Sequence, residues 1–142
     1  MAFDTLFAAS SISSSGMSAE RLRMELIANN IANAQTTRTP GGGPFRRQDV
    51  IFESVMNEHT GGASKPGGVR AVEIIEDQSE PQTVYHPGHP DADSKGYLQL
   101  PNVQLPIEMV NLLTASRAYE ANVKTAQTFK QMSEQALTLL RG

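Results

Sequence analysis

The sequence predicts a mainly α-helical protein, in which two long terminal helices pair as a coiled-coil-like hairpin and a short irregular β segment lies between them. All eight prolines and nine of the eleven glycines lie between residues 40 and 106. Because proline and glycine break helices, we expect an N-terminal helical arm (1–35), a Pro/Gly-rich β or loop middle (36–106) and a C-terminal long helix (107–142). Apolar residues also recur at helical spacing in both arms, as in helices that bury one face. The C-terminal helix is expected to pair with the N-terminal arm.

The N-terminal arm, about Phe3 to Asn33, is predicted to be an amphipathic helix with a weak seam. Its apolar positions are Phe3, Phe7, Met17, Met24, Ala28 and Ile31. Ser10, Ser14 and Arg21 fill the same stripe and weaken it. Since such a helix is marginal alone in water, we expect it to become ordered only when a partner covers the stripe.

Three asparagines mark the end of this arm. Asn29, Asn30 and Asn33 disfavour a helix interior, but their side chains can bond backbone groups. We therefore expect them to finish the helix and to set the direction of the chain into residues 36–40.

The middle segment contains four short stretches of β-like composition, each bounded by glycine, proline or Asp-Ser turns. These stretches are residues 47–53, 69–75, 83–85 and 96–100. We expect them to form a small sheet.

The C-terminal arm, Ile107 to Arg141, contains no glycine or proline. Pro106 and Glu108 are typical of a first helical turn, and Gly142 is typical of a helix end. Such a helix would extend roughly 50 Å. Its seam mixes bulky and small residues at coiled-coil-like intervals and needs another helix to pack against. The seam consists of Leu112, Ala115, Tyr119, Ala126, Phe129, Ala136 and Leu140.

Composition excludes several classes of function. The chain has no cysteine, which removes disulfides, thiolate zinc sites and thiol catalysis. The formal net charge of -3 provides no positive field for nucleic acid. The first residues lack the positive charge and unbroken apolar run of a cleavable signal. No apolar run approaches the roughly 20 residues of a membrane-spanning helix.

One loop contains side chains that can bind metals. His86, His89, Asp91 and Asp93 form the pattern H-x-x-H-x-D-x-D. Pro87 and neighbouring turn residues interrupt it, and no helix places the imidazoles on one face, so a plain loop is favoured. We expect no catalytic site, cofactor or metal. A secreted metal-dependent enzyme that uses this loop is the alternative function.

Both ends of the chain resemble one protein family. Residues 15–37, SGMSAERLRMELIANNIANAQTT, resemble the N-terminal signature of the bacterial flagellar rod and axial proteins. Residues 101–140, which include IEMV and RAYEAN, resemble the C-terminal signature of that family. The stretches TRTPGGGPFRRQDVIF and HPDADSKGYLQLPNV are most similar to the short proximal-rod members. The resemblance covers nearly the whole chain and is weakest over residues 57–81.

This resemblance implies a structural subunit of the flagellar proximal rod, the periplasm-spanning drive shaft that transmits torque from motor to hook. It implies contacts with copies of itself, with other rod proteins and with basal-body ring or junction components. It also implies passage through the flagellar type III export apparatus without a cleaved signal peptide. Neither nucleic acid nor a small-molecule substrate is implied. Another short rod or axial subunit is the alternative within the family.

The resemblance also marks residues for subunit interaction, all of them in the two terminal arms. They are Met17, Met24, Ala28, Asn29, Asn30, Ile31, Ala32, Asn33, Glu108, Met109, Val110, Leu112, Arg117, Tyr119, Glu120, Asn122, Phe129 and Leu140.

Overall fold

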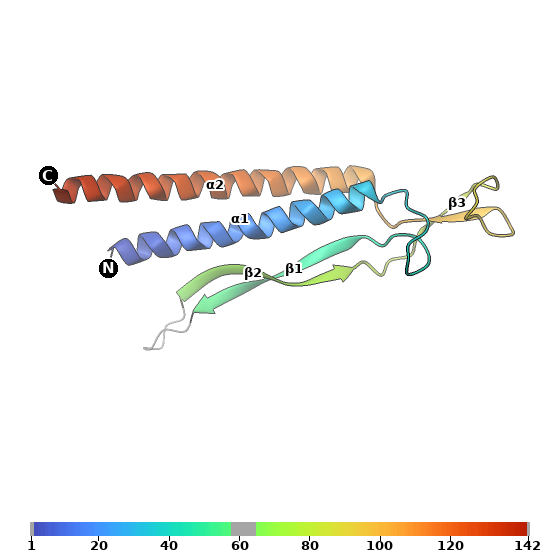
Figure 1. The fold of residues 1–142 in the computed structure, drawn as a ribbon, viewed down its shortest axis with the longest axis horizontal. Coiled ribbons are helices and arrows are strands. Elements are labelled where there is room, and N and C mark those ends of the chain that lie inside the picture. Colours follow the sequence, from blue (N-terminus) through green and yellow to red (C-terminus); the bar gives the residue numbers. More distant parts are fainter. Residues whose placement is uncertain (1, 58–64, 142) are drawn as a thin grey trace. The chain divides into compact units, whose positions relative to one another are not determined.

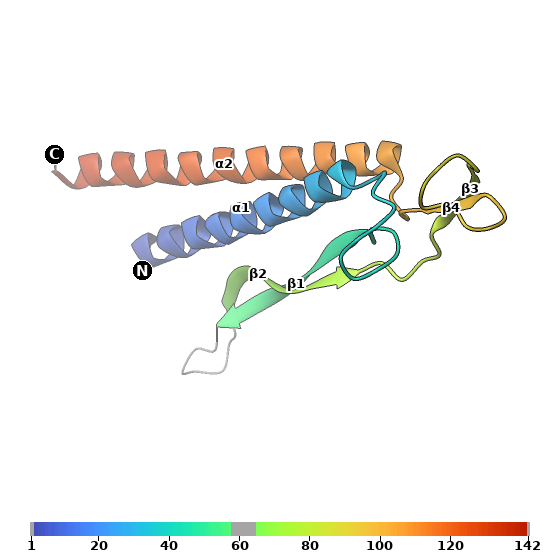
Figure 2. The ribbon, with the colours of Figure 1, turned by 45° about the vertical axis from the view of Figure 1, so that its right-hand side comes forward.

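The computed structural model describes residues 2–57 and 65–141, which contain two long helices and four strands (Figure 1). The fold is mainly helical with a small antiparallel β region, so the predicted fold class is confirmed (Figure 2). Each predicted strand coincides with an observed one, within four residues at either end. The order of elements is α1 (Ala2–Ala32), β1 (Gln48–Asn57), β2 (Lys65–Glu76), β3 (Gln82–Tyr85), β4 (Tyr97–Leu100) and α2 (Leu105–Arg141).

Helix α1 ends where the asparagines were expected to end it. The backbone N–H and the side-chain Nδ2 of Asn33 both donate to the carbonyl of Asn29, at 3.0 and 2.9 Å. Thr36 Oγ1 then donates to Asn33 Oδ1 at 3.1 Å. These bonds satisfy a carbonyl of the last turn and direct the chain into a tight turn after Ala32.

Helix α2 begins at Leu105, two residues before the predicted start. Pro106 fits its first turn, because the N–H that proline lacks has no helical partner at that position. The backbone N–H of Glu108 donates to the carbonyl of Gln104 at 3.0 Å, which closes this turn. The expected role of Gly142 at the other end lies outside the described residues.

The chain forms two compact units. Unit 1 contains Met1–Leu22, Ile51–Glu73 and Thr114–Gly142, and unit 2 contains Arg23–Val50 and Ile74–Leu113. Both long helices contribute to both units.

In unit 1 the two helices pack through small residues. A Cβ on Gly16 of α1 would lie 2.9 Å from Nδ2 of Asn122 in α2, so only glycine allows this approach without movement. Ala19 of α1 and Ala115 of α2 are also buried. Small side chains at these positions let the helix backbones approach closely.

Strand β2 contacts α1 within unit 1. The backbone N–H of Val69 donates to Ser15 Oγ at 3.1 Å, and this hydroxyl donates to the carbonyl of Ile12 at 2.7 Å. Gly68 lies directly against Ser15 with a positive φ of 105°. One serine of the helix therefore holds the start of β2.

Unit 2 contains the β3–β4 hairpin, whose strands are antiparallel, with Gln82 opposite Leu100 and Tyr85 opposite Tyr97. The two tyrosine rings meet edge to face with centroids 5.4 Å apart, a favourable cross-strand pair. The core of the unit consists of Ile27, Val50, Leu98 and Val103.

Each unit contains a contact between α1 and α2. Gly16 lies against Asn122 in unit 1, and Asn30 is bonded to Glu108 in unit 2. Neither helix, as far as it is described, is long and apolar enough to cross a membrane.

Candidate functional site

Unit 2 buries a polar network where α1 ends and α2 begins. Asn30 is 0% exposed and Glu108 is 1% exposed. Asn30 Nδ2 donates to Glu108 Oε2 at 3.2 Å. Buried amides and carboxylates are costly unless every polar atom finds a partner. Asn30 Oδ1 and Glu108 Oε1 therefore also need hydrogen-bond donors nearby.

Gln48 satisfies the rest of the Asn30 amide through its main chain. The Gln48 N–H donates to Asn30 Oδ1, and Asn30 Nδ2 donates to the Gln48 carbonyl, both at 2.8 Å. The side chain of Asn30 thus forms the same pair of bonds with β1 that a neighbouring strand would form. This explains why an asparagine lies on the buried face of the helix.

Arg47 satisfies the charge of Glu108. Its Nε donates to Glu108 Oε1 at 2.7 Å, and its Nη1 donates to Asp49 Oδ2 at 3.0 Å. Burial alone would lower the pKa of the Arg47 guanidinium, but the hydrogen bonds and charges of Glu108 and Asp49 outweigh burial and raise it. The Arg47 guanidinium therefore keeps its positive charge beside the two carboxylates.

A turn from the middle segment completes the network. The N–H of Arg47 donates to Asn102 Oδ1 at 2.8 Å, and the N–H of Asp77 donates to the Arg47 carbonyl at 2.8 Å. Asn102 Nδ2 in turn donates to the Asp77 carbonyl at 3.0 Å. The Ser79 N–H donates to the Asp77 carboxylate, and with the nearby arginines this lowers the pKa of Asp77.

The residues marked for subunit interaction fall into three groups in the structure. Asn30 and Glu108 are buried and use their polar atoms inside unit 2. The half-buried ones are Met17, Met24, Ile31, Asn33, Leu112, Tyr119, Asn122 and Phe129. The exposed ones are Ala28, Asn29, Ala32, Met109, Val110, Arg117, Glu120 and Leu140.

Sequence reasoning missed part of the exposed apolar surface of α2. Ile107, Leu113, Leu137 and Leu139 are all more than half exposed, and Leu139 reaches 84%. They lie outside the predicted seam, and a search of all large apolar residues of the arm would have found them. Large apolar side chains left in water at both ends of one helix are typical of surfaces that other chains cover.

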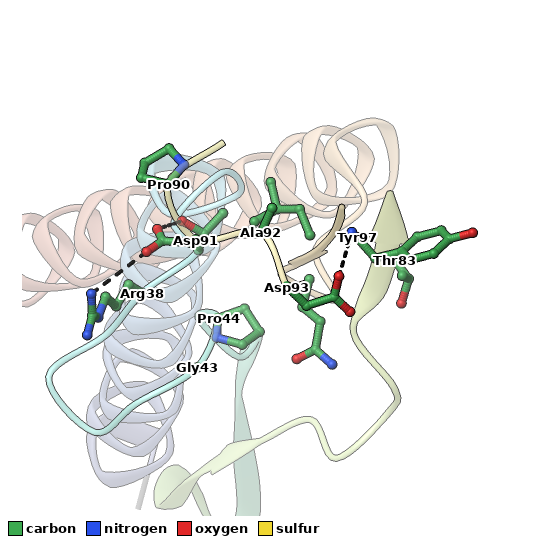
Figure 3. Close-up of a pocket in the computed structure, with 12 residues that line it drawn as sticks. Arg38, Gly43, Pro44, Thr83, Pro90, Asp91, Ala92, Asp93 and Tyr97 are labelled. Carbon is green, nitrogen blue, oxygen red and sulfur yellow. Dashed lines mark hydrogen bonds and ion pairs between the residues drawn. The ribbon is translucent and has the colours of Figure 1, made fainter. Parts of the chain in front are cut away.

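The His-Asp loop lines a pocket of about 490 Å³ in unit 2 (Figure 3). Asp91 accepts a hydrogen bond from Thr37 Oγ1 at 2.8 Å and lies 3.8 Å from the Arg38 guanidinium. Asp93 Oδ1 accepts the N–H groups of Lys95 and Tyr97. The Asp91 carboxylate therefore joins the loop to the segment that follows α1, and the Asp93 carboxylate stabilises its own turn. Over the part of the chain that the structure describes, no three histidine, aspartate or glutamate side chains lie close enough together to hold a metal ion.

Comparison with known proteins agrees with the fold and with the motifs. A model described as flagella basal body rod protein matches residues 11–38. A second model, described as flagellar basal body rod FlgEFG protein C-terminal, matches residues 94–139. These two regions contain most of α1 and α2 and the residues Asn30 and Glu108.

Curated relatives match over nearly the full chain. The flagellar basal-body rod protein FlgC of Borreliella burgdorferi is 45% identical, over 96% of this chain and 99% of its own. The protein of the same name from Escherichia coli is 42% identical over 90% of this chain and 92% of its own. That of Bacillus subtilis is 37% identical over 95% and 98%. On these matches, together with the paired terminal helices, the chain belongs to the flagellar basal-body rod protein family.

Proposed function

We propose that this structural subunit of the proximal rod assembles with copies of itself and with other rod proteins through the exposed apolar face of α2. The observation that carries this proposal is the exposure of Met109, Val110 and Leu113, which are 58%, 63% and 53% exposed. An isolated soluble helix has little reason to present three large apolar side chains together. Their exposure in the single chain has a physical reason if a neighbouring subunit covers them in the rod.

The geometry of a helix places these residues on the outward side. Glu108 and Ala115 are seven residues apart and both buried, so they mark the inward face. At about 100° per residue, Val110 lies about 200° from Glu108. Leu113 lies about 200° from Ala115 by the same count. Two side chains that point away from the partner helix cannot be covered by it.

Burial of this face would stabilise an assembly appreciably. Full burial of one large aliphatic side chain contributes about 1.5–3 kcal/mol, so covering the exposed half of each contributes about 1 kcal/mol. Small gains of this kind, repeated at every subunit, suit a shaft that resists torque through many interfaces. Where the contacting surface differs from the surface contacted and the rotation between subunits does not close a ring, such interfaces repeat along a filament.

The same proposal covers location and delivery. The chain acts in the basal body, in the part of the rod that spans the periplasm, and transmits torque from motor to hook. It reaches that place through the flagellar type III export apparatus, without a cleaved signal peptide, and it meets ring or junction components there. The two helical arms (1–35 and 107–142) provide the assembly contacts, and the role requires neither catalysis nor a cofactor.

Replacement of Val110 by Asp tests the proposal in cells that lack the native gene. Asp at an exposed position leaves the fold intact but places a charge in the proposed contact. The variant should restore little or no swimming and should be depleted from purified basal bodies. Gln131→Asp, at an exposed polar position of the same helix, is the matched control and should restore both.

Two readings separate a failed interface from a failed fold. Far-UV circular dichroism of the purified Val110→Asp chain should match that of the unmodified chain. Normal swimming and normal recovery of Val110→Asp in basal bodies would refute an assembly role for this face.

A further inference from the structure

The buried network of unit 2 couples two events that could otherwise occur separately. One event is the pairing of the end of α1 with the start of α2. The other is the docking of residues 47–48 at the start of β1. The contacts of Asn30 and Glu108 show why one requires the other.

The two helices cannot satisfy their own buried polar groups. Asn30 and Glu108 share a single hydrogen bond of 3.2 Å. Without further partners, Asn30 Oδ1 would lack a donor and Glu108 would carry an uncompensated charge in an apolar setting. A buried carboxylate without a partner is among the most unfavourable groups in a protein interior. The helix ends therefore do not pair stably by themselves.

Residues 47–48 provide the missing partners. The Gln48 main chain satisfies both ends of the Asn30 amide, and the Arg47 guanidinium neutralises Glu108. The side chain of Arg47 is 20% exposed and that of Glu108 is 1% exposed, so this ion pair is largely shielded from water. Arg70–Glu53, by contrast, is an exposed pair whose side chains are 68% and 55% exposed.

The dependence also runs the other way. The side chain of Arg47 is held by Glu108 and Asp49, and its main chain is held by Asn102 and Asp77. These bonds come from α2, from the same strand, and from the two segments that flank the β3–β4 hairpin. Residues 47–48 thus have their full set of partners only when the helix ends, with Asn30 and Glu108, are in place.

We propose that Asn30, Arg47 and Glu108 form an interlock, in which the helix ends of unit 2 pair only when residues 47–48 are docked between them. The interlock makes the end of α1, the start of β1 and the start of α2 open and close together. The interlock couples three segments of one chain. It does not depend on which surface of the chain contacts other subunits.

Hydrogen exchange of the full-length, purified chain tests the interlock. In the unmodified chain, the amides of residues 27–33, 46–50 and 108–112 should be protected and should share one opening free energy. Arg47→Met should lower protection in both helical segments by about 100-fold or more, although Arg47 lies in neither helix. Arg46→Met, whose native side chain makes one 3.4 Å bond to the Asp77 carbonyl, is the control and should change protection less than about tenfold.

A second variant distinguishes an unpaired charge from general damage. Arg47→Met combined with Glu108→Leu removes the pair together and should restore most of the protection of residues 27–33 and 108–112, because replacement of both partners by apolar groups is often neutral. Unchanged helix protection in Arg47→Met would overturn the interlock. Failure of the double variant to recover would do so too, as would independent opening of the three segments in the unmodified chain.

Discussion

Replacement of Gly68 by alanine should detach the start of β2 from α1. Gly68 has a backbone φ of +105°, which residues other than glycine rarely adopt. An added Cβ would overlap Ser15 Oγ and would lie 3.0 Å from Ser15 Cβ and 3.6 Å from the backbone Cα of Ile12. The serine can rotate, but the helix backbone behind it cannot give way locally.

The expected cost is the sum of two effects. Holding a non-glycine residue at a positive φ costs about 1–3 kcal/mol. Rotation of Ser15 also breaks its bond with the Val69 N–H, and a typical hydrogen bond contributes about 0.5–1.5 kcal/mol. We therefore expect Gly68→Ala to lower the free energy of unfolding by about 2–4 kcal/mol.

Urea unfolding, followed by far-UV circular dichroism, measures this cost. Gly88→Ala is the matched control, because no atom lies within 4 Å of its added Cβ and its φ is ordinary. In a Ser15→Ala background the bond to Val69 is already absent, so the cost of Gly68→Ala should be smaller by about 1 kcal/mol. The exchange rate of the Val69 amide should rise in both single variants.

Two results would refute this reasoning. One is a Gly68→Ala chain as stable as the Gly88→Ala chain. The other is a cost that is identical with and without the Ser15 hydroxyl, which would show that strand and helix do not meet through this residue.

Three further predictions concern other parts of the fold. Leu98→Ala should lower the free energy of unfolding in urea by about 2–5 kcal/mol, because Leu98 is 5% exposed; a loss below about 1 kcal/mol would contradict its place in the core. The pKa of Asp77 is held below its ordinary value of 3.8, mainly by the Ser79 N–H. Its contribution to stability is therefore complete above that pH and is lost as the pH falls through the lowered value. Acid unfolding should show this loss, and Asp77→Asn should abolish that part of the pH dependence. Gly16→Leu should cost about 1–3 kcal/mol in the same urea assay because it displaces Asn122, and equal stability of the two chains would argue against close helix packing there.

The elements of this fold could be predicted because they depend on local properties. The confinement of proline and glycine to residues 40–106 separated the helical arms from the strands. The run from Leu105 to Arg141 has no glycine and one proline, placed where a first turn accepts it. Asn33 ends α1 through a bond to a residue only four positions earlier. Such short-range effects are visible in any single sequence.

The buried network could not be predicted in the same way. Asn30 and Glu108 are 78 residues apart and meet only because the end of α1 packs against the start of α2. Asn30 also uses the main chain of Gln48, and main-chain atoms leave no trace in a residue pattern. The contact of Ser15 with Val69 is of the same kind, since the serine looked like an ordinary weak position in an apolar stripe.

The sequence by itself determined the two helices, the four strands and the family, because helix breakers, strand formers and family motifs act or are recognised within short stretches of chain. Only the tertiary structure decided which residues are buried within the chain and which remain exposed. It turned Glu108 inward onto Arg47 and Val110 outward into solvent, although the two are neighbours in one motif. The physical reason is the helical period, which sends residues two positions apart to opposite faces once a partner helix defines the inside.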